Sequence, residues 1–409
     1  MKKLLYILLA LLLIIASILY LGNRYLNSGS IEPDNSVWNE HIGRDTTVGL
    51  WPDKYANYFS YTFVRTDENI GIKIKGQFAD ARYMSFNVYN LEDKSTQGSI
   101  IDSEILTDSG NPNPTLDGSP TGEEQYTIHV IPEKYKDADL PNKLVFRDDS
   151  KILLIVIRYY DFNQDDYAGV PLPTTQAFEL NESQIEPVNL PLALNLKSMV
   201  DGPKIAESIW FMYDTENLEA LDGPKTKQQY YSLPFFRVIG EGMIQNYDNL
   251  YLLSAVTKKE DEVYVMKFKA PTFVKTAEDI GKADVRYWSV NIGDDISYVF
   301  NALKDEDCVI DSSGYATIVM AQENEAIKNR CKALGFNFME WNITRDRAFI
   351  IYRNMLSNPA FSGHFNQVSP LPEGANYVDF EANTQIGEYA PKGFRMKSKD
   401  FLKEFTETD

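Results

Sequence analysis

ADVRYWSVNI, at residues 283–292, has a close copy earlier in the chain, ADARYMSFNV at residues 79–88. Apolar and polar side chains alternate in both copies, with the period of two that is typical of a half-buried β-strand. In the earlier copy Arg82, Met84, Phe86 and Val88 share one face, and Tyr83, Ser85 and Asn87 share the other. A repeated unit of this kind indicates a duplicated, all-β protein.

The segments around the two copies also recur in the same order. Each copy follows two short apolar segments that flank a charged turn, and each precedes a continuous apolar segment that ends in an arginine. The predicted strands are 58–64, 70–75, 79–88, 126–131 and 152–159 in the first unit, and 250–256, 263–269, 283–292, 316–321 and 348–353 in the second. We read the paired flanking segments as hairpins. The pattern predicts a mainly β protein of two related jelly-roll or sandwich-like units.

Composition divides the chain into six segments. They are an anchor at 1–26, a polar stalk at 27–46, a first β unit at 47–190, a partly helical bridge at 191–245, a second β unit at 246–385 and a tail with a short helix at 386–409. A chain of 409 residues suits about two domains.

The N-terminus predicts where the protein resides. Lys2 and Lys3 precede an uncharged apolar run over residues 4–22, close to the ~20 residues that span a bilayer. The positive-inside rule keeps the lysines in the cytoplasm, so we expect a single-pass signal anchor in the cell membrane with the body outside the cytoplasm. Cleavage of this segment, which would give a secreted protein, is the alternative.

The net charge and the positions of histidine and cysteine argue against nucleic-acid binding and against a zinc site. The formal net charge of −19 disfavours nucleic acid, because phosphate binding depends on clustered lysine and arginine. The three histidines are scattered and no CxxC pair occurs, so we expect no cofactor and no zinc site. Cys308 and Cys331 are either a disulfide or two separate buried thiols.

Arginines at matched places are the strongest site candidates. An arginine on an apolar strand needs a partner, so each either forms a structural ion pair, with Asp80, Asp284 or another carboxylate, or lines a groove that grips a carboxylate or sulfate ligand. The candidate ligand-binding residues are Arg82, Tyr83, Arg286, Tyr287, Arg158 and Arg353.

Weaker candidates lie in acidic and aromatic segments. Asp161, Asn163 and Asp165 have the spacing of a calcium loop, but no EF-hand follows, so we favour an acidic β-turn and expect no metal. The acidic run 305–307 could supply paired carboxylates for glycoside hydrolysis. Trp38 and Trp51 lie in loop-like segments and are candidates for stacking on sugars, whereas Trp288 is expected in the core. The sequence assigns no catalytic residue.

Several motifs resemble a bacterial family. They are the ARYMSFNVYN strand, AGVPLP at 168–173, DSSGYATIV at 311–319, NFMEW at 337–341 and RNMLSNPAF at 353–361. Together they resemble uncharacterised exported proteins related to the paired domains of unknown function twelve-fifty-four and twelve-fourteen. The resemblance implies jelly-roll-like β domains and no agreed activity or catalytic residues.

The function expected from the sequence is that of a membrane-anchored, extracytoplasmic binding or cell-envelope interaction module. The alternative is an extracellular enzyme that acts on a glycan or a small carboxylate, and we favour the non-catalytic reading. A glycan or small carboxylate is the expected ligand class, and the membrane is the one partner that the sequence names.

Overall fold

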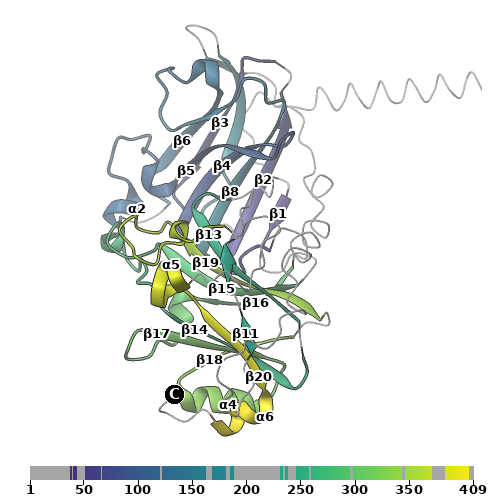
Figure 1. Ribbon diagram of the computed structural model, residues 1–409. Helices are drawn as coiled ribbons and strands as arrows, with labels where there is room; N and C mark the ends of the chain where they lie inside the picture. The colour runs from purple at the N-terminus through teal and green to yellow at the C-terminus, as the bar shows by residue number, and fades with distance from the viewer. Residues whose placement is uncertain are drawn as a thin grey trace, which may run out of the picture.

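Two β-sandwiches follow one another along the chain and lie end to end in the computed structural model (Figure 1). The structure describes residues 37–38, 40–43, 51–65, 67–119, 122–162, 168–180, 185–187, 231–233, 235–237, 246–257, 259–294, 298–342, 346–370 and 383–404. The prediction of a mainly β protein built from sandwich-like units is confirmed.

The first sandwich comprises two five-stranded sheets. One has the order β1 (Glu40–Ile42), β2 (Ala56–Val64), β8 (Ile152–Phe162), β4 (Ala81–Asn90) and β5 (Ser95–Ile101). The other has the order β10 (Ile185–Pro187), β9 (Thr174–Leu180), β3 (Ile70–Gln77), β6 (Gln125–Pro132) and β7 (Lys143–Phe146). Side chains from both sheets, such as Phe86 and Ile128, pack into one core.

The second sandwich repeats this arrangement. One sheet has the order β12 (Phe236–Arg237), β13 (Asn249–Thr257), β19 (Arg347–Met355), β15 (Tyr287–Asp294) and β16 (Val299–Lys304). The other has the order β11 (Tyr231–Leu233), β20 (Lys392–Lys397), β14 (Glu262–Lys269), β17 (Tyr315–Ala321) and β18 (Asn337–Glu340). Trp288 lies in this core, as predicted.

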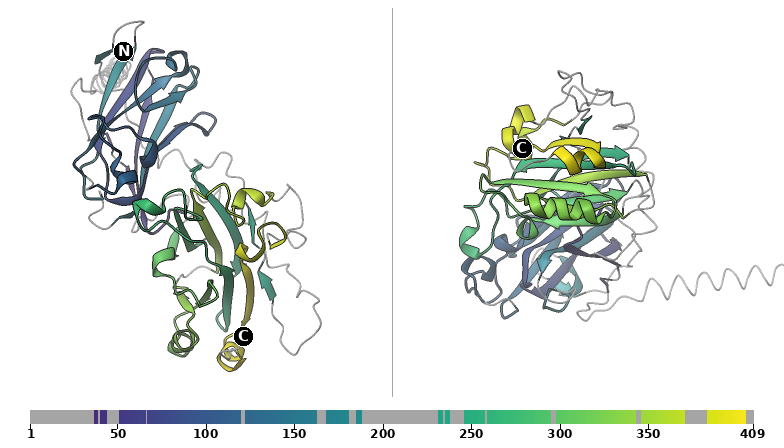
Figure 2. Two further views of the ribbon diagram at one scale, coloured as in Figure 1. Left: turned by 90° about the vertical axis from the view of Figure 1, so that its left-hand side faces the viewer. Right: turned by 90° about the horizontal axis from the view of Figure 1, so that it is seen from below.

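Among the described residues, helices are few and short. They are α2 (Pro114–Asp117), α4 (Glu325–Leu334), α5 (Asn383–Ile386), α6 (Ser398–Glu404) and the 3₁₀ turns η1 (Asp102–Glu104), η2 (Glu133–Tyr135), η4 (Ala277–Asp279), η5 (Asp305–Asp307), η6 (Phe365–Gln367) and η8 (Gly387–Tyr389). The predicted short helix of the tail is α6. Figure 2 shows α4 and α6 together beneath the second sandwich.

Corresponding strands occupy corresponding places in the two sandwiches. β4 and β15 each lie between an antiparallel hairpin partner and the long apolar strand, β8 or β19. Each second sheet ends in a parallel pair, β6 with β7 and β17 with β18. The two copies of the RY motif therefore have the same structural position.

The predicted hairpins are wrong. β2 and β3 are adjacent in sequence but belong to the two facing sheets, and β13 and β14 behave in the same way. Core residues explain the difference, because Tyr61 on β2 and Ile72 on β3 both point into the same core. The charged turns therefore carry the chain from one sheet across to the other.

Both faces of the RY strands are buried, which differs from the expected half-buried strand. Met84, Phe86 and Val88 face the core as predicted. Ser85 and Asn87, on the opposite face, are also completely buried. Their burial means that another layer covers the outer face of the sheet at this end of the sandwich.

Several sequence-based boundaries differ from the strands observed. β1 lies within the predicted stalk, β11 and β12 lie within the predicted bridge, and β20 lies within the predicted tail and pairs with β14. The predicted anchor at 1–26 and the helical part of the bridge lie outside the described residues. No helix among the described residues has the length and apolar character needed to cross a membrane.

Candidate functional site: a buried arginine network between the two units

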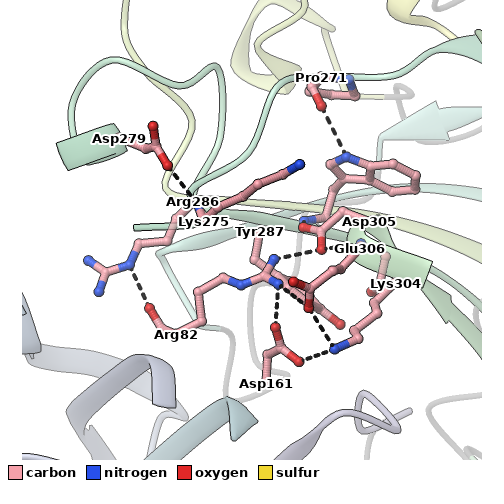
Figure 3. A network of polar contacts seen from close by, with 12 residues as sticks. Arg82, Asp161, Pro271, Lys275, Asp279, Arg286, Tyr287, Lys304, Asp305 and Glu306 are labelled. Atoms are coloured by element: carbon pink, nitrogen blue, oxygen red, sulfur yellow. Dashed lines mark hydrogen bonds and ion pairs between the residues drawn. The ribbon is translucent and has the colours of Figure 1, made fainter. Parts of the chain in front are cut away.

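The two units meet where the RY strands begin. At this joint an arginine from each unit binds a carboxylate of the other unit. Arg82, at the start of β4, donates to Asp305 of the second unit at 2.6 Å. Arg286, just before β15, donates to Asp102 of the first unit at 2.9 Å. Each arginine of the repeated motif thus pairs with a carboxylate of the other unit. Figure 3 shows the pair between Arg82 and Asp305.

Each of these carboxylates also holds its own unit together. Asp102 Oδ2 accepts from the backbone N–H of Met84 at 2.8 Å, and Asp305 Oδ2 accepts from that of Trp288 at 2.9 Å. Met84 and Trp288 occupy the same position in the two copies of the motif. The carboxylates of η1 and η5 are therefore fixed by their own RY strand and aimed at the arginine of the other unit.

Further charges surround Arg82. Its guanidinium also pairs with Asp161 at the end of β8 and, at 3.2 Å, with Glu306. Lys304 contacts both of these carboxylates, and the ring of Tyr287 lies 5.6 Å from the Arg82 guanidinium carbon. Figure 3 shows these side chains converging from the two units.

Burial and neighbouring charge shift the pKa values of the paired groups. Burial raises the pKa of Asp305 to about 6, although the Arg82 charge acts in the opposite direction. Burial also raises the pKa of Asp102 against the effect of Arg286. For Arg82, burial lowers the pKa but the surrounding carboxylates, Asp305 first, outweigh it, and the guanidinium stays charged.

A loop of the first unit covers the outer face of β15. Asp53 accepts hydrogen bonds from Tyr287 Oη at 3.2 Å and from Ser289 Oγ at 2.5 Å, and its Oδ2 lies 3.1 Å from Arg353 Nη1. Trp51 donates from Nε1 to the backbone oxygen of Asp294 at 2.8 Å. The outer face of the second unit is thus closed by residues of the first.

A loop of the second unit reciprocates on the outer face of β4. Tyr83 donates from Oη to Asp248 Oδ2 at 2.5 Å, and Asn246 Nδ2 donates to Tyr83 Oη at 3.3 Å. Asn246 occupies the position that Asp53 has in the first unit. Asp53 lies five residues before Tyr58, which pairs across the sheet with Arg158. Asn246 lies five residues before Tyr251, which pairs in the same way with Arg353.

Arg158 lies on the same outer face as Tyr83 but has neutral partners. It donates to Asn87 Oδ1 and, at 2.7 Å, to Tyr89 Oη. The rings of Tyr58 and Tyr89 lie 5.8 Å and 5.7 Å from its guanidinium carbon. Its counterpart Arg353 contacts the Asp53 carboxylate and the backbone oxygen of Trp51.

A tyrosine cluster fills the centre of the joint. Tyr160 stacks edge-on against Tyr83 of its own unit and Tyr287 of the other, each with ring centroids 5.6 Å apart. Its hydroxyl bonds that of Tyr58 at 2.7 Å and accepts from Asn249 at 3.1 Å. All six predicted arginines and tyrosines therefore lie in one continuous inter-unit network.

The other sequence candidates lie as follows. Asp161 is engaged by Arg82 and Lys304, while Asn163 and Asp165 lie outside the described residues. No group of three metal-ligating side chains occurs in the part of the chain that the structure describes. Cys308 and Cys331 are free thiols in different apolar clusters, so the disulfide alternative is wrong.

The predicted aromatic platform is also wrong. Trp38 packs against Tyr61 in the first core, and Trp51 packs edge-on against Phe349. Both side chains are buried. Each donates its indole N–H to a backbone oxygen and packs against an aromatic ring. Neither offers a face on which a sugar could stack.

Sequence reasoning missed the carboxylates Asp53, Asp102 and Asp248. Asp102 could have been found, because it stands 18 residues after Met84 as Asp305 stands 17 after Trp288. Asp53 and Asp248 occupy non-equivalent positions of the two loops, so the internal repeat does not point to them.

Comparisons with known proteins identify no family. No protein-family model matches the chain, and no curated protein sequence does. A crystal structure of an uncharacterised protein from Burkholderia cenocepacia is similar over 92% of this chain and 86% of its own, with 11% identity and a TM-score of 0.49. The VPA0106 protein from Vibrio parahaemolyticus is similar over 85% and 90%, with 13% identity and a TM-score of 0.43.

Proposed function

We propose that this protein is a membrane-anchored interaction module of the cell envelope, with its two sandwiches outside the cytoplasm. The observation that carries the proposal is the use of the repeated arginines. Arg82 and Arg286, the strongest candidates for chemistry, are committed to ion pairs that bind one unit to the other. Such pairs make the chain a two-unit scaffold of fixed geometry.

A fixed scaffold suits binding better than the enzymatic alternative. Catalysis on a glycan would need a carboxylate pair free to protonate a leaving group and to act on the sugar carbon. Asp305 and Glu306 are instead bound to Arg82, and Asp305 also accepts a backbone hydrogen bond. We therefore assign Asp305 and Glu306 to the joint.

The membrane part of the proposal rests on the sequence alone. Lys2 and Lys3 followed by the apolar run 4–22 match a signal anchor with its body on the outer side. Kinship with the exported proteins of the paired domains of unknown function twelve-fifty-four and twelve-fourteen would agree with that location.

The test separates anchoring from binding. The full chain and a variant lacking residues 2–22 are expressed and fractionated, and protease is added to intact spheroplasts. We expect the full chain to remain with the membrane after a carbonate wash and to be digested from outside, and the shortened chain to leave the membrane fraction. Recovery of the full chain in the soluble cytoplasmic fraction would contradict the proposal.

A second arm tests the binding role. The purified full chain is screened by thermal shift against glycans, organic acids and divalent ions. A saturable shift with one class, and no turnover of that compound, supports a module. Chemical conversion of the compound would instead favour the extracellular enzyme.

A further inference from the structure

We propose that Arg158 is the anchor of a carboxylate-binding site at the joint between the two units. The proposal names a ligand class for one place in the module, and it rests on the proposed binding function. It starts from a difference between the two units at otherwise matched positions. Arg158 and Arg353 hold the same place on β8 and β19.

The two arginines differ in their counter-charge. Arg353 has the carboxylate of Asp53 at 3.1 Å, delivered by the loop of the other unit. At the matching position the loop over Arg158 carries Asn246, which is neutral and donates its amide to Tyr83 instead. Among the described residues, no carboxylate forms an ion pair with Arg158.

The two loops correspond in detail, so the comparison is between like positions. Asp53 Oδ1 accepts from the backbone N–H of Tyr55 at 3.0 Å, and Asn246 Oδ1 accepts from that of Asp248 at 3.1 Å. The same local turn is therefore built with an acid in one loop and an amide in the other. The exchange places an amide at this turn position, and the acid of the second loop, Asp248, lies two residues further along and bonds Tyr83.

Arg158 also has unused hydrogen-bonding capacity. The residue is only 4% exposed, and its Nε has no hydrogen-bond partner among the described residues. Its partners Asn87 and Tyr89 are neutral, and a buried cation with neutral partners alone is costly. Asp248 of the facing loop is close enough for the Arg158 charge to act on its pKa, but its carboxylate is occupied by Tyr83.

The groups around Arg158 suit a planar anion. A guanidinium binds a carboxylate through two parallel N–H donors, and the surrounding tyrosines offer hydroxyl donors and ring edges. Tyr58, whose ring lies over Arg158, is only partly buried. A carboxylate from a small organic acid or from an acidic sugar would supply the charge that Asn246 lacks.

The test uses the duplication as its own control. Sodium acetate, succinate and glucuronate are titrated into the full chain at pH 7 by calorimetry, with sodium chloride at equal ionic strength as reference. Asn246→Asp restores the acid found in the other loop, and should weaken acetate binding about tenfold or more while raising the melting temperature without ligand. The relative affinities of succinate and glucuronate separate an organic acid from a sugar acid.

The reciprocal variant, Asp53→Asn, tests whether the missing acid is what allows an arginine to bind acetate. Asp53→Asn leaves Arg353 with an amide, and should add a second acetate site per chain. Binding of acetate by Asn246→Asp with unchanged affinity, or no binding by the wild-type chain, would overturn the inference. Either failure leaves the envelope module testable, because membrane fractionation does not depend on Arg158.

Discussion

At the scale of single residues, the joint is a case of buried ion pairs retained for geometry. Desolvation of two charges often offsets their attraction, so such pairs stabilise a fold less than their short distances suggest. The rise in the pKa of Asp102 and Asp305 reflects that cost. What the pairs supply is a specific register between two units that each present the same strand end.

Removal of one member of a buried ion pair should lower the free energy of unfolding. Arg286→Ala leaves Asp102 buried without its cation, so we expect the free energy of unfolding to fall by about 3–5 kcal/mol. Urea unfolding at pH 7 measures the change. Arg147→Ala breaks an exposed pair with Asp93 and should lower the free energy of unfolding far less than Arg286→Ala does.

The same variant tests the alternative interpretation of the arginines. If Arg286 mainly grips a ligand, Arg286→Ala would keep wild-type stability and lose only ligand affinity. A stability close to wild type would therefore remove the structural assignment made from its contact with Asp102.

The pH dependence of stability should carry the signature of Asp305. Its pKa is about 6 in the folded chain and 3.8 as the ordinary value, so the folded state holds a proton more tightly than the unfolded state. The contribution of Asp305 is therefore fully present below about pH 3.8, and is lost as the pH rises through 6. Two units of pKa correspond to about 3 kcal/mol.

Asp305→Asn is the variant that isolates this effect. Its unfolding free energy, compared with wild type by urea titration from pH 4 to pH 7.5, should lack the decline that wild type shows across pH 6. Equal slopes for the two proteins would show that the Asp305 carboxyl does not titrate in this range. Exposed carboxylates with lowered pKa values, such as Asp279, act in the opposite direction at lower pH and are shared by both proteins.

At the scale of elements, the sequence predicts strands better than it predicts their partners. Period-two alternation predicts β4 and β15, and continuous apolar segments predict β8 and β19, because both patterns depend on neighbouring residues. The assignment of β2 and β3 to facing sheets depends on which core their apolar faces share, and that is set by residues far away in the chain. The same limit explains why the sequence does not predict β20 as a strand of the second sandwich.

The carboxylates that pair with Arg82 and Arg286 are likewise set by residues far away in the chain. Arg82 and Arg286 were recognised because the motif repeats, and the alternative of a structural ion pair included an unspecified carboxylate. Asp80 and Asp284 are their sequence neighbours, but the acids used come from η1 and η5 of the opposite unit. A pairing between units has no signal in local spacing.

One close approach between elements offers a direct test of the loop that covers β15. A Cβ added at Gly293 would lie 2.4 Å from Trp51 Cδ1, so the side chain of residue 293 must be absent for Trp51 to pack. Gly293→Ala should therefore destabilise the chain by about 1–3 kcal/mol, measured by urea unfolding. Combined with Trp51→Leu, which removes the clashing ring, its additional cost should shrink.

Additivity of the two substitutions would contradict this account. Independent effects would mean that a methyl group at position 293 is tolerated or rejected for reasons other than the ring of Trp51.

At the scale of the whole molecule, the ion pairs and loop contacts that each unit makes with the other hold the two sandwiches together as one rigid unit. Arg82 and Arg286 cross in opposite directions, and the Asp53 and Asn246 loops each cover the outer face of the other unit. Each unit therefore completes the burial of the other, and the polar faces of β4 and β15 stay dry only while both are folded. Unfolding of one unit should expose these faces and destabilise its neighbour.

The last prediction follows from this mutual burial. The wild-type chain should unfold in a single calorimetric transition, with equal calorimetric and van't Hoff enthalpies. The fourfold variant Arg82→Gln, Asp305→Asn, Arg286→Gln and Asp102→Asn neutralises both crossing pairs while keeping similar shapes, and should separate the transition into two. A matched variant, Arg147→Gln with Asp93→Asn, neutralises an exposed pair within one unit and should keep the single transition. Two transitions already in the wild-type chain would mean that the units fold independently and that the exchanged arginines only orient them.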